Sequence, residues 1–379
     1  MAMATSMCTN IATAASCLQR SSLRSCEPTS SSVSNLASWQ SKSVKLFSNS
    51  YSKSVGNGFA KESGKGSGAA RATVTVDREL NPEPRSNLDR EEENSTSELL
   101  CCPICHKPLQ RTGPSGLTQN AIRSSGFSCH SCRRKFSNRG DYVDLTILDG
   151  TRVYDENTTA GAEIFRSPVV SFVYERGWRQ NFARAGFPGP DEEFKMAQNY
   201  FKSVQGGVIL DVSCGSGLFT RRFAQSGDFS SVIALDFSEN MLRQSNEFIR
   251  QDPSLANSNI ALVRADVARL PFATGSIDAV HAGAALHCWP SPAAGMAEIA
   301  RILKPGGVFV ATTFLTPLPI IDFGNKDIRK AIKGAISSST LRYWDEAELE
   351  ELMGVCGLVE YTRVRLNQFI MVSAKRAKE

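Results

Sequence analysis

The chain has 379 residues, of which 41% are hydrophobic and 21% are charged, as is typical of a globular protein. No apolar run reaches the roughly 18 residues that a membrane-spanning helix needs, because Pro317 and Pro319 interrupt the most apolar late stretch. The net charge of +5 comes from residues 1–71, which hold eight Lys or Arg and two Asp or Glu, so the remainder carries −1. That remainder lacks the overall positive charge typical of nucleic-acid-binding proteins.

Residues 1–71 have the composition of an organelle transit peptide. They are rich in Ser, Thr and Ala, poor in acidic residues, and contain no apolar core of the secretory type. The opening Met-Ala and the excess of Ser over Arg favour a plastid over a mitochondrion; a disordered regulatory tail is the alternative. We therefore predict a chloroplast protein, in the stroma or peripheral on the thylakoid or plastoglobule, with residues 72–98 as a disordered linker.

Residues 99–148 contain two C-x-x-C pairs, Cys102 with Cys105 and Cys129 with Cys132. Zinc prefers four tetrahedral thiolate or imidazole ligands, and each C-x-x-C turn presents two thiolates to one ion. A segment with so few large apolar residues also needs a metal to stabilise its fold. The pattern predicts a structural zinc site made of these four cysteines, in a zinc-ribbon module.

Alternatives to this ligand set exist within the same module. Cys101 could replace Cys102 in the first pair, although Pro103 favours Cys102, and His106 or His130 could replace a thiolate. A redox-active dithiol would need a single C-x-x-C at a helix start in a thioredoxin-like setting, which neither pair has.

The cysteine module resembles the N-terminal zinc ribbon of bacterial methyltransferases that act on a guanine of large-subunit ribosomal RNA. The resemblance includes the segments 133–136 and 140–145, but the second pair is Cys/Cys where that family commonly has Cys/His. It implies plastid rRNA as one candidate partner, with phosphate contacts from the basic side chains Arg133, Arg134, Lys135 and Arg139. A solvated basic face is the alternative.

From residue 203 to 379, short apolar runs alternate with helical patterns, which predicts a doubly wound α/β sheet. The first strand, 208–212, runs into a Gly-containing turn, 213–217, where a ligand can approach the backbone closely. A dinucleotide-binding turn would have Gly or Ala at Thr220, so a pyrophosphate-bearing cofactor is disfavoured.

Acidic residues follow the next two predicted strands. The strand 231–235 ends in Asp236, which is placed to bind ribose hydroxyls, and Ser238 is the expected N-cap of the following helix. The strand 260–263 leads to Asp266, and a fourth strand lies within residues 275–280. The carboxyl ends of these strands are where a cofactor site is expected.

Five motifs in order resemble those of class I S-adenosylmethionine-dependent methyltransferases, of the type that includes the ubiquinone and menaquinone methyltransferases. They are Asp-Val-Ser-Cys-Gly-Ser-Gly (211–217), Leu-Asp-Phe-Ser (235–238), Ala-Asp-Val with Leu-Pro-Phe (265–272), Ser-Ile-Asp-Ala-Val (276–280) and Leu-Lys-Pro-Gly-Gly (303–307). The match spans roughly residues 206–375, about one domain. The resemblance implies a Rossmann-like, seven-stranded sheet that binds S-adenosylmethionine.

The same resemblance implies a cofactor site made of Asp211, Gly215, Gly217, Asp236, Met241, Asp266 and Val267. The first carboxylate would hold the methionine ammonium group, the second the ribose hydroxyls and the third the adenine amino group. The two glycines would leave room for the methionine and ribose, and the Met and Val would pack on the adenine. Ser213 departs from the family pattern, which has glycine there.

The methyl acceptor is not identified by these motifs. His287, after the fourth strand, is the candidate general base, with a packing histidine as the alternative. Residues 149–202 resemble the helical lid of this family, and their aromatic residues (Phe165, Phe172, Tyr174, Trp178, Phe182, Phe187 and Phe194) would wall an acceptor pocket or form core.

The sequence therefore leaves three candidate functions. The first is methylation of a small or lipophilic acceptor such as a quinol, with peripheral membrane or lipid-body association. The second is methylation of a ribosomal RNA base. The third is a non-catalytic cofactor-binding scaffold.

Overall fold

The structure is a computed structural model, and it describes residues 99–149, 179–316 and 342–378. The predicted transit peptide and linker, and most of the predicted lid segment, lie outside these residues. Within the described ranges, no helix has both the length and the hydrophobicity that a membrane crossing requires.

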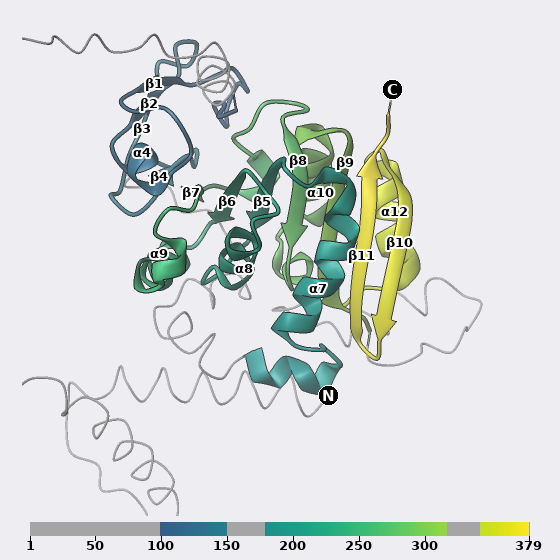
Figure 1. Ribbon diagram of the computed structural model, residues 1–379. Helices are drawn as coiled ribbons and strands as arrows, with labels where there is room; N and C mark the ends of the chain where they lie inside the picture. Colours follow the sequence, from purple (N-terminus) through teal and green to yellow (C-terminus); the bar gives the residue numbers. More distant parts are fainter. Residues whose placement is uncertain (1–98, 150–178, 317–341, 379) are drawn as a thin grey trace, which may run out of the picture. The chain divides into compact units, whose positions relative to one another are not determined.

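An eight-stranded mixed sheet forms the centre of the fold, in the order β10-β11-β9-β8-β5-β6-β7-β4 (Figure 1). Its strands are β4 (Val143–Asp144), β5 (Val208–Val212), β6 (Ser231–Asp236), β7 (Ile260–Arg264), β8 (Ile277–Ala282), β9 (Leu303–Phe314), β10 (Leu358–Leu366) and β11 (Phe369–Arg376). The six strands from β9 to β4 are parallel, and β11 and β10 close the other edge antiparallel. The expected Rossmann-like class I methyltransferase sheet is confirmed.

The strand count of seven is corrected to eight. The added strand is β4, which belongs to the cysteine module and pairs in parallel with β7, with Val143 opposite Val263 and Asp144 opposite Arg264. Pairing satisfies backbone groups that the edge strand β7 would otherwise leave open. The module is therefore joined to the sheet by main-chain hydrogen bonds.

Helices cover both faces of the sheet and bury two hydrophobic clusters. Apolar residues of α7 (Pro190–Phe201), α8 (Leu218–Ser226) and α9 (Glu239–Gln251) pack on one face, and those of α10 (Pro292–Ile302) and α12 (Glu346–Val355) on the other. Local capping agrees with the sequence. The Ser238 side chain accepts from Met241 N at the start of α9, and a capping box with Asp345 begins α12.

The cysteine module is built around a small antiparallel sheet, β1 (Gln110–Thr112), β2 (Gly126–Ser128) and β3 (Lys135–Phe136), with the short helix α4 (Gln119–Arg123). Its apolar side chains, such as Phe127 and Phe136, belong to the same buried cluster as α10 and α12. We call residues 99–149 the ribbon. The ribbon and the sheet thus share one continuous core.

Candidate functional site

The turn after β5 has a backbone that favours glycine at three positions. Ser213, Gly215 and Gly217 have φ values of 55°, 56° and 78°, all in the left-handed region. This explains why glycine is usual where Ser213 stands. The Ser213 hydroxyl accepts a hydrogen bond from Trp289 Nε1 at 3.0 Å, so the serine ties the turn to the segment after β8.

Asp236, at the end of β6, bridges two turns. Its Oδ2 accepts from Gly215 N at 2.9 Å and its Oδ1 accepts from Ser238 N at 2.8 Å. Burial raises the pKa of this half-buried carboxyl to about 6, although the two backbone N–H groups favour its ionised form. A carboxylate held in this way is preorganised to accept further hydrogen bonds from a ligand.

We expect cofactor affinity to fall when Asp236 is protonated. Ribose hydroxyls donate to an ionised carboxylate, and with a pKa of about 6 most of the ionised form is lost on going from pH 7.5 to pH 5. Binding of S-adenosylhomocysteine should weaken about tenfold over this range, as proton linkage requires. Titration calorimetry at several pH values measures this. Asp236→Asn should bind with an affinity that hardly changes with pH, and a flat wild-type profile would contradict the assignment.

Asp211 lies near the carboxyl end of β5 and is fully buried. Its Oδ2 accepts from the Thr220 hydroxyl at 2.6 Å, and its Oδ1 lies 2.8 Å from His281 Nδ1. His281 is the opposite residue on the neighbouring strand β8, and its ring packs against Phe219 on α8. The predicted contact of Asp211 with the methionine ammonium group therefore requires one of these partners to be replaced or shared.

His281 is a site residue that sequence reasoning missed. The sequence contains a signal for it, a histidine inside an apolar strand. A buried polar side chain needs a hydrogen-bonding partner, so such a histidine indicates a polar contact in the core. Gly283 lies against the His281 ring, because a Cβ at this glycine would lie 2.8 Å from His281 Cε1. A larger residue at this position would therefore displace the ring.

Gly217 is required by helix packing as well as by its backbone conformation. A Cβ at this position would lie 2.2 Å from Ser245 Oγ and 3.1 Å from Ser245 Cβ, on α9. The close approach of α8 to α9 therefore depends on the missing side chain. The expected role of Gly217 in leaving room for the cofactor remains a prediction.

Gly217→Ala should destabilise the fold more than Gly227→Ala. Both glycines have a positive φ, 78° and 70°, so each substitution carries a left-handed penalty of about 1–2 kcal/mol. A Cβ at Gly227 meets no atom within 4 Å, whereas one at Gly217 meets Ser245. Urea denaturation of both variants isolates the contact with α9. Equal losses of unfolding free energy would show that the contact is not needed.

The adenine side of the predicted site lies after β7. Asp266 Oδ1 accepts from Ala268 N at 2.9 Å and caps the 3-10 helix η5 (Val267–Arg269). Met241 and Val267 are buried, and their packing on the adenine stays a prediction. Trp289 lies beside Val267, since a Cβ on Gly295 would contact both side chains. Trp289 is a second residue that the sequence did not single out.

His287 is buried in the 3-10 helix η6 (Leu286–Cys288) that follows β8. Burial lowers its pKa to about 3, so the imidazole is neutral at physiological pH and is a weak base. Its Nδ1 lies 3.3 Å from Thr313 Oγ1, and its ring meets Phe314 edge-on, with centroids 4.7 Å apart. Burial, with a smaller contribution from Asp236, raises the pKa of the neighbouring Cys288 thiol to about 12.

An aromatic cluster lies against His287. The Phe314 ring packs on Phe182 and Phe187, with centroids 5.3 and 4.7 Å apart, and Phe187 also packs on Phe369. Of the aromatic residues predicted to wall an acceptor pocket, Phe165, Phe172, Tyr174 and Trp178 lie outside the described residues. Phe182 and Phe187 pack in this cluster beside η6, whereas Phe194 packs on Phe223 of α8.

The four cysteines predicted to bind metal come together in the ribbon. The Sγ atoms of Cys102, Cys105, Cys129 and Cys132 lie within 4.8 Å of one another. Tetrahedral zinc with Zn–S bonds of about 2.3 Å requires sulfurs roughly 3.8 Å apart. Cys101, His106 and His130 are not part of this group. The donor set and its spacing fit a structural zinc ion.

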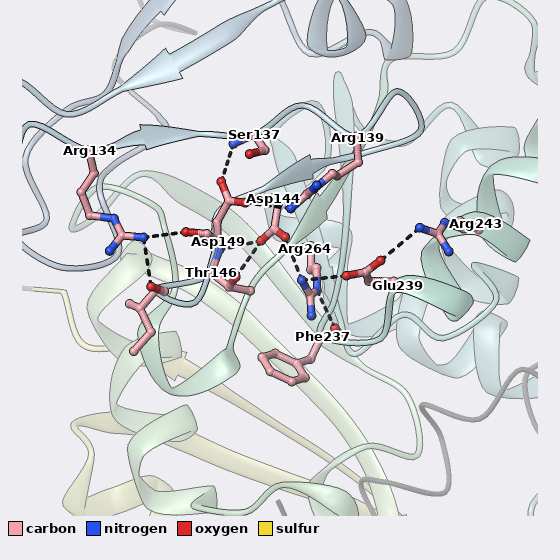
Figure 2. Close-up of polar contacts among 11 residues, drawn as sticks. Arg134, Ser137, Arg139, Asp144, Thr146, Asp149, Phe237, Glu239, Arg243 and Arg264 are labelled. Carbon is pink, nitrogen blue, oxygen red and sulfur yellow. Dashed lines mark hydrogen bonds and ion pairs between the residues drawn. The ribbon is translucent and has the colours of Figure 1, made fainter. Parts of the chain in front are cut away.

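Two of the basic ribbon side chains that were candidates for phosphate contacts serve the ribbon itself (Figure 2). Arg134 donates to the carbonyl oxygens of Ile147 and Asp149, at 3.1 and 2.9 Å. Arg139 forms an ion pair with the buried carboxylate of Asp149, at 3.0 Å. The structure therefore gives these two arginines an internal function.

Comparison with known proteins shows the family of the chain. Residues 210–311 match the family model described as methyltransferase domain. The chain is 51% identical over 298 residues to an uncharacterized chloroplastic methyltransferase of Arabidopsis thaliana, covering 77% of this chain and 83% of that protein. A second such Arabidopsis protein is 49% identical, covering 76% and 82%. A demethylmenaquinone methyltransferase of Desulfitobacterium hafniense is 30% identical, covering 51% and 67%. The chain therefore belongs to the S-adenosylmethionine-dependent methyltransferases.

Proposed function

We propose that this methyltransferase binds S-adenosylmethionine across the carboxyl ends of β5, β6 and β7 and methylates a small lipophilic acceptor, such as a quinol, in the plastid. The observation that carries the cofactor site is the carboxylate of Asp236, which is held between the N–H groups of Gly215 and Ser238. Such a carboxylate at the end of β6, next to β5 at the topological switch point, is suited to ribose hydroxyls.

The remaining cofactor contacts are those that the family resemblance implies. Asp266 would accept from the adenine amino group, and Met241 and Val267 would pack on the two faces of the ring. Asp211 would act at the methionine end, beneath the turn that contains Gly215. The cofactor's sulfonium makes its methyl group electrophilic, so the chain has to align the acceptor with that methyl group and exclude water.

The acceptor class is supported by the aromatic cluster beside η6. Apolar side chains such as Phe182 and Phe314 suit a ring or prenyl-type acceptor better than a charged one. The relatives named demethylmenaquinone methyltransferases support the same class. Neutral His287, with a pKa of about 3, is suited to hydrogen bonding with an acceptor hydroxyl rather than to full proton removal.

Plastid location is supported by two independent observations. Residues 1–71 have the Ser-rich, acid-poor composition of a transit peptide. The two Arabidopsis relatives are both named as chloroplastic.

A labelling experiment separates the candidate acceptors. Zinc-replete protein is incubated with plastid extract and methyl-labelled S-adenosylmethionine, and the extract is split into lipid, RNA and protein fractions. We expect label in the lipid fraction, and less of it with the Asp236→Ala variant when the cofactor is not saturating. Label in ribosomal RNA would instead identify the acceptor as an RNA base. Cofactor binding with no label in any fraction would favour a non-catalytic scaffold.

A further inference from the structure

The ribbon contacts both loops that would surround the adenosine half of the cofactor. The first contact is made by β4, which pairs with β7 so that Asp144 lies opposite Arg264. Leu145 N also donates to the Arg264 carbonyl oxygen at 2.8 Å. The ribbon therefore reaches the end of β7, two residues before Asp266.

The Arg264 guanidinium connects the ribbon to the turn after β6 (Figure 2). It lies 2.8 Å from Asp144 Oδ2 on the ribbon and 3.0 Å from Glu239 Oε1 at the start of α9. Its Nε donates to the Phe237 carbonyl oxygen at 3.1 Å. Phe237 stands between Asp236 and Ser238, so Arg264 holds the peptide that positions the proposed ribose-binding carboxylate.

Asp144 is buried, and both of its carboxylate oxygens have partners. Its side chain is 0% exposed, and that of Arg264 is 13% exposed. Its Oδ1 accepts from both the backbone N and the hydroxyl of Thr146, at 3.1 and 2.7 Å. A buried carboxylate bound on both oxygens fixes its arginine partner in one place, because moving either group would leave an unpaired buried charge.

The second contact is made by the segment that leads into the first cysteine pair. Leu100 forms an antiparallel bridge with Phe272, Cys101 N donates to Pro271 O at 2.8 Å, and Ala273 N donates to Leu99 O at 3.0 Å. The partner segment follows η5, which contains Val267. The metal site and the proposed adenine-binding loop are thus joined by main-chain bonds.

We propose that the ribbon positions the adenosine end of the cofactor, with Asp144 as the positioning residue that acts through Arg264. Zinc bound by the four cysteines keeps the ribbon in the conformation that makes these contacts. Cofactor affinity then depends on ribbon integrity, although no ribbon side chain needs to touch the cofactor. This inference rests on the cofactor site proposed above.

The test uses Asp144→Asn in the full-length protein, with Asp149→Asn as the matched control. Both residues are buried ribbon carboxylates, but the partners of Asp149 within the described residues all belong to the ribbon, among them Ser137 N and Arg139. We expect Asp144→Asn to weaken S-adenosylhomocysteine binding about three- to tenfold, a size typical of coupling through a contiguous network. The zinc content should remain one ion per chain, and Asp149→Asn should bind with wild-type affinity. Wild-type affinity in folded, zinc-replete Asp144→Asn would overturn the proposal.

A second substitution tests the route of the coupling. Arg264→Gln should weaken binding at least as much as Asp144→Asn, and combining the two should add little, because both act on the same contact. Fully additive losses would show that Asp144 does not act through Arg264 and would overturn that assignment.

Zinc withdrawal from the wild-type protein covers the case in which Asp144→Asn does not fold. A chelator under reducing conditions should weaken S-adenosylhomocysteine binding and speed amide exchange in the peptide 236–241, and added zinc should reverse both effects. Unchanged affinity and unchanged amide exchange after zinc loss would overturn this proposal but not the cofactor site. Failure of the zinc-replete wild type to bind S-adenosylhomocysteine would instead overturn the cofactor site, and this inference with it.

Discussion

Replacing Cys102 and Cys129 by Ser together should leave the full-length protein without zinc and should unfold the ribbon. One thiol is lost from each C-x-x-C pair, so two of the four sulfurs that lie within 4.8 Å of one another are removed. Small zinc modules gain about 10–16 kcal/mol from the metal, whereas whole domains are stable by about 5–15 kcal/mol. The metal contribution is therefore too large for the few apolar contacts of the ribbon to replace.

Metal analysis, thermal unfolding and limited proteolysis measure this effect. Cys101→Ala is the matched control, because Cys101 is a buried neighbour of Cys102 that does not belong to the four-thiol group. The control should keep one zinc ion per chain and an intact ribbon. A doubly substituted protein with full zinc content, or with wild-type resistance to proteolysis in residues 99–149, would contradict the ligand assignment.

Asp236→Ala should weaken binding of S-adenosylhomocysteine by about 1–3 kcal/mol, the usual cost of removing a buried hydrogen-bonding partner. This corresponds to a rise in Kd of about 5- to 150-fold. The substitution removes the acceptor proposed for the ribose hydroxyls. It also leaves the N–H groups of Gly215 and Ser238 without the carboxylate that aligns the two turns.

A carboxylate near the other end of the same strand provides the control. Asp228 precedes β6 and accepts from the side chains of Gln198 and Gln205, so Asp228→Ala removes a comparable network away from the proposed site. Its affinity for S-adenosylhomocysteine should equal that of the wild type. Equal affinities of Asp236→Ala and Asp228→Ala would show that Asp236 does not contact the cofactor.

The sequence predicted the parallel strands well because their signals are local. The apolar runs at 208–212, 231–235 and 260–263 correspond to β5, β6 and β7. Each C-x-x-C pair likewise places two metal ligands within a few residues of each other in the sequence. Such features need no knowledge of distant parts of the chain.

The missed features all depend on contacts between distant segments. Strand β4 has two residues, too few to show periodicity, and its partner β7 lies about 120 residues further on. The sequence likewise does not show which side chains are the partners of Asp211. Thr220 disfavoured a dinucleotide turn, yet its hydroxyl donates to Asp211, and His281 reaches the same carboxylate from the next strand.

The central claim is that one site at the carboxyl ends of β5, β6 and β7 binds S-adenosylmethionine. Titration calorimetry of S-adenosylhomocysteine into the folded, zinc-replete, full-length protein tests it most directly. The predicted result is one saturable site per chain whose affinity falls with Asp236→Ala. The contradicting result is the absence of measurable binding by the folded wild-type protein.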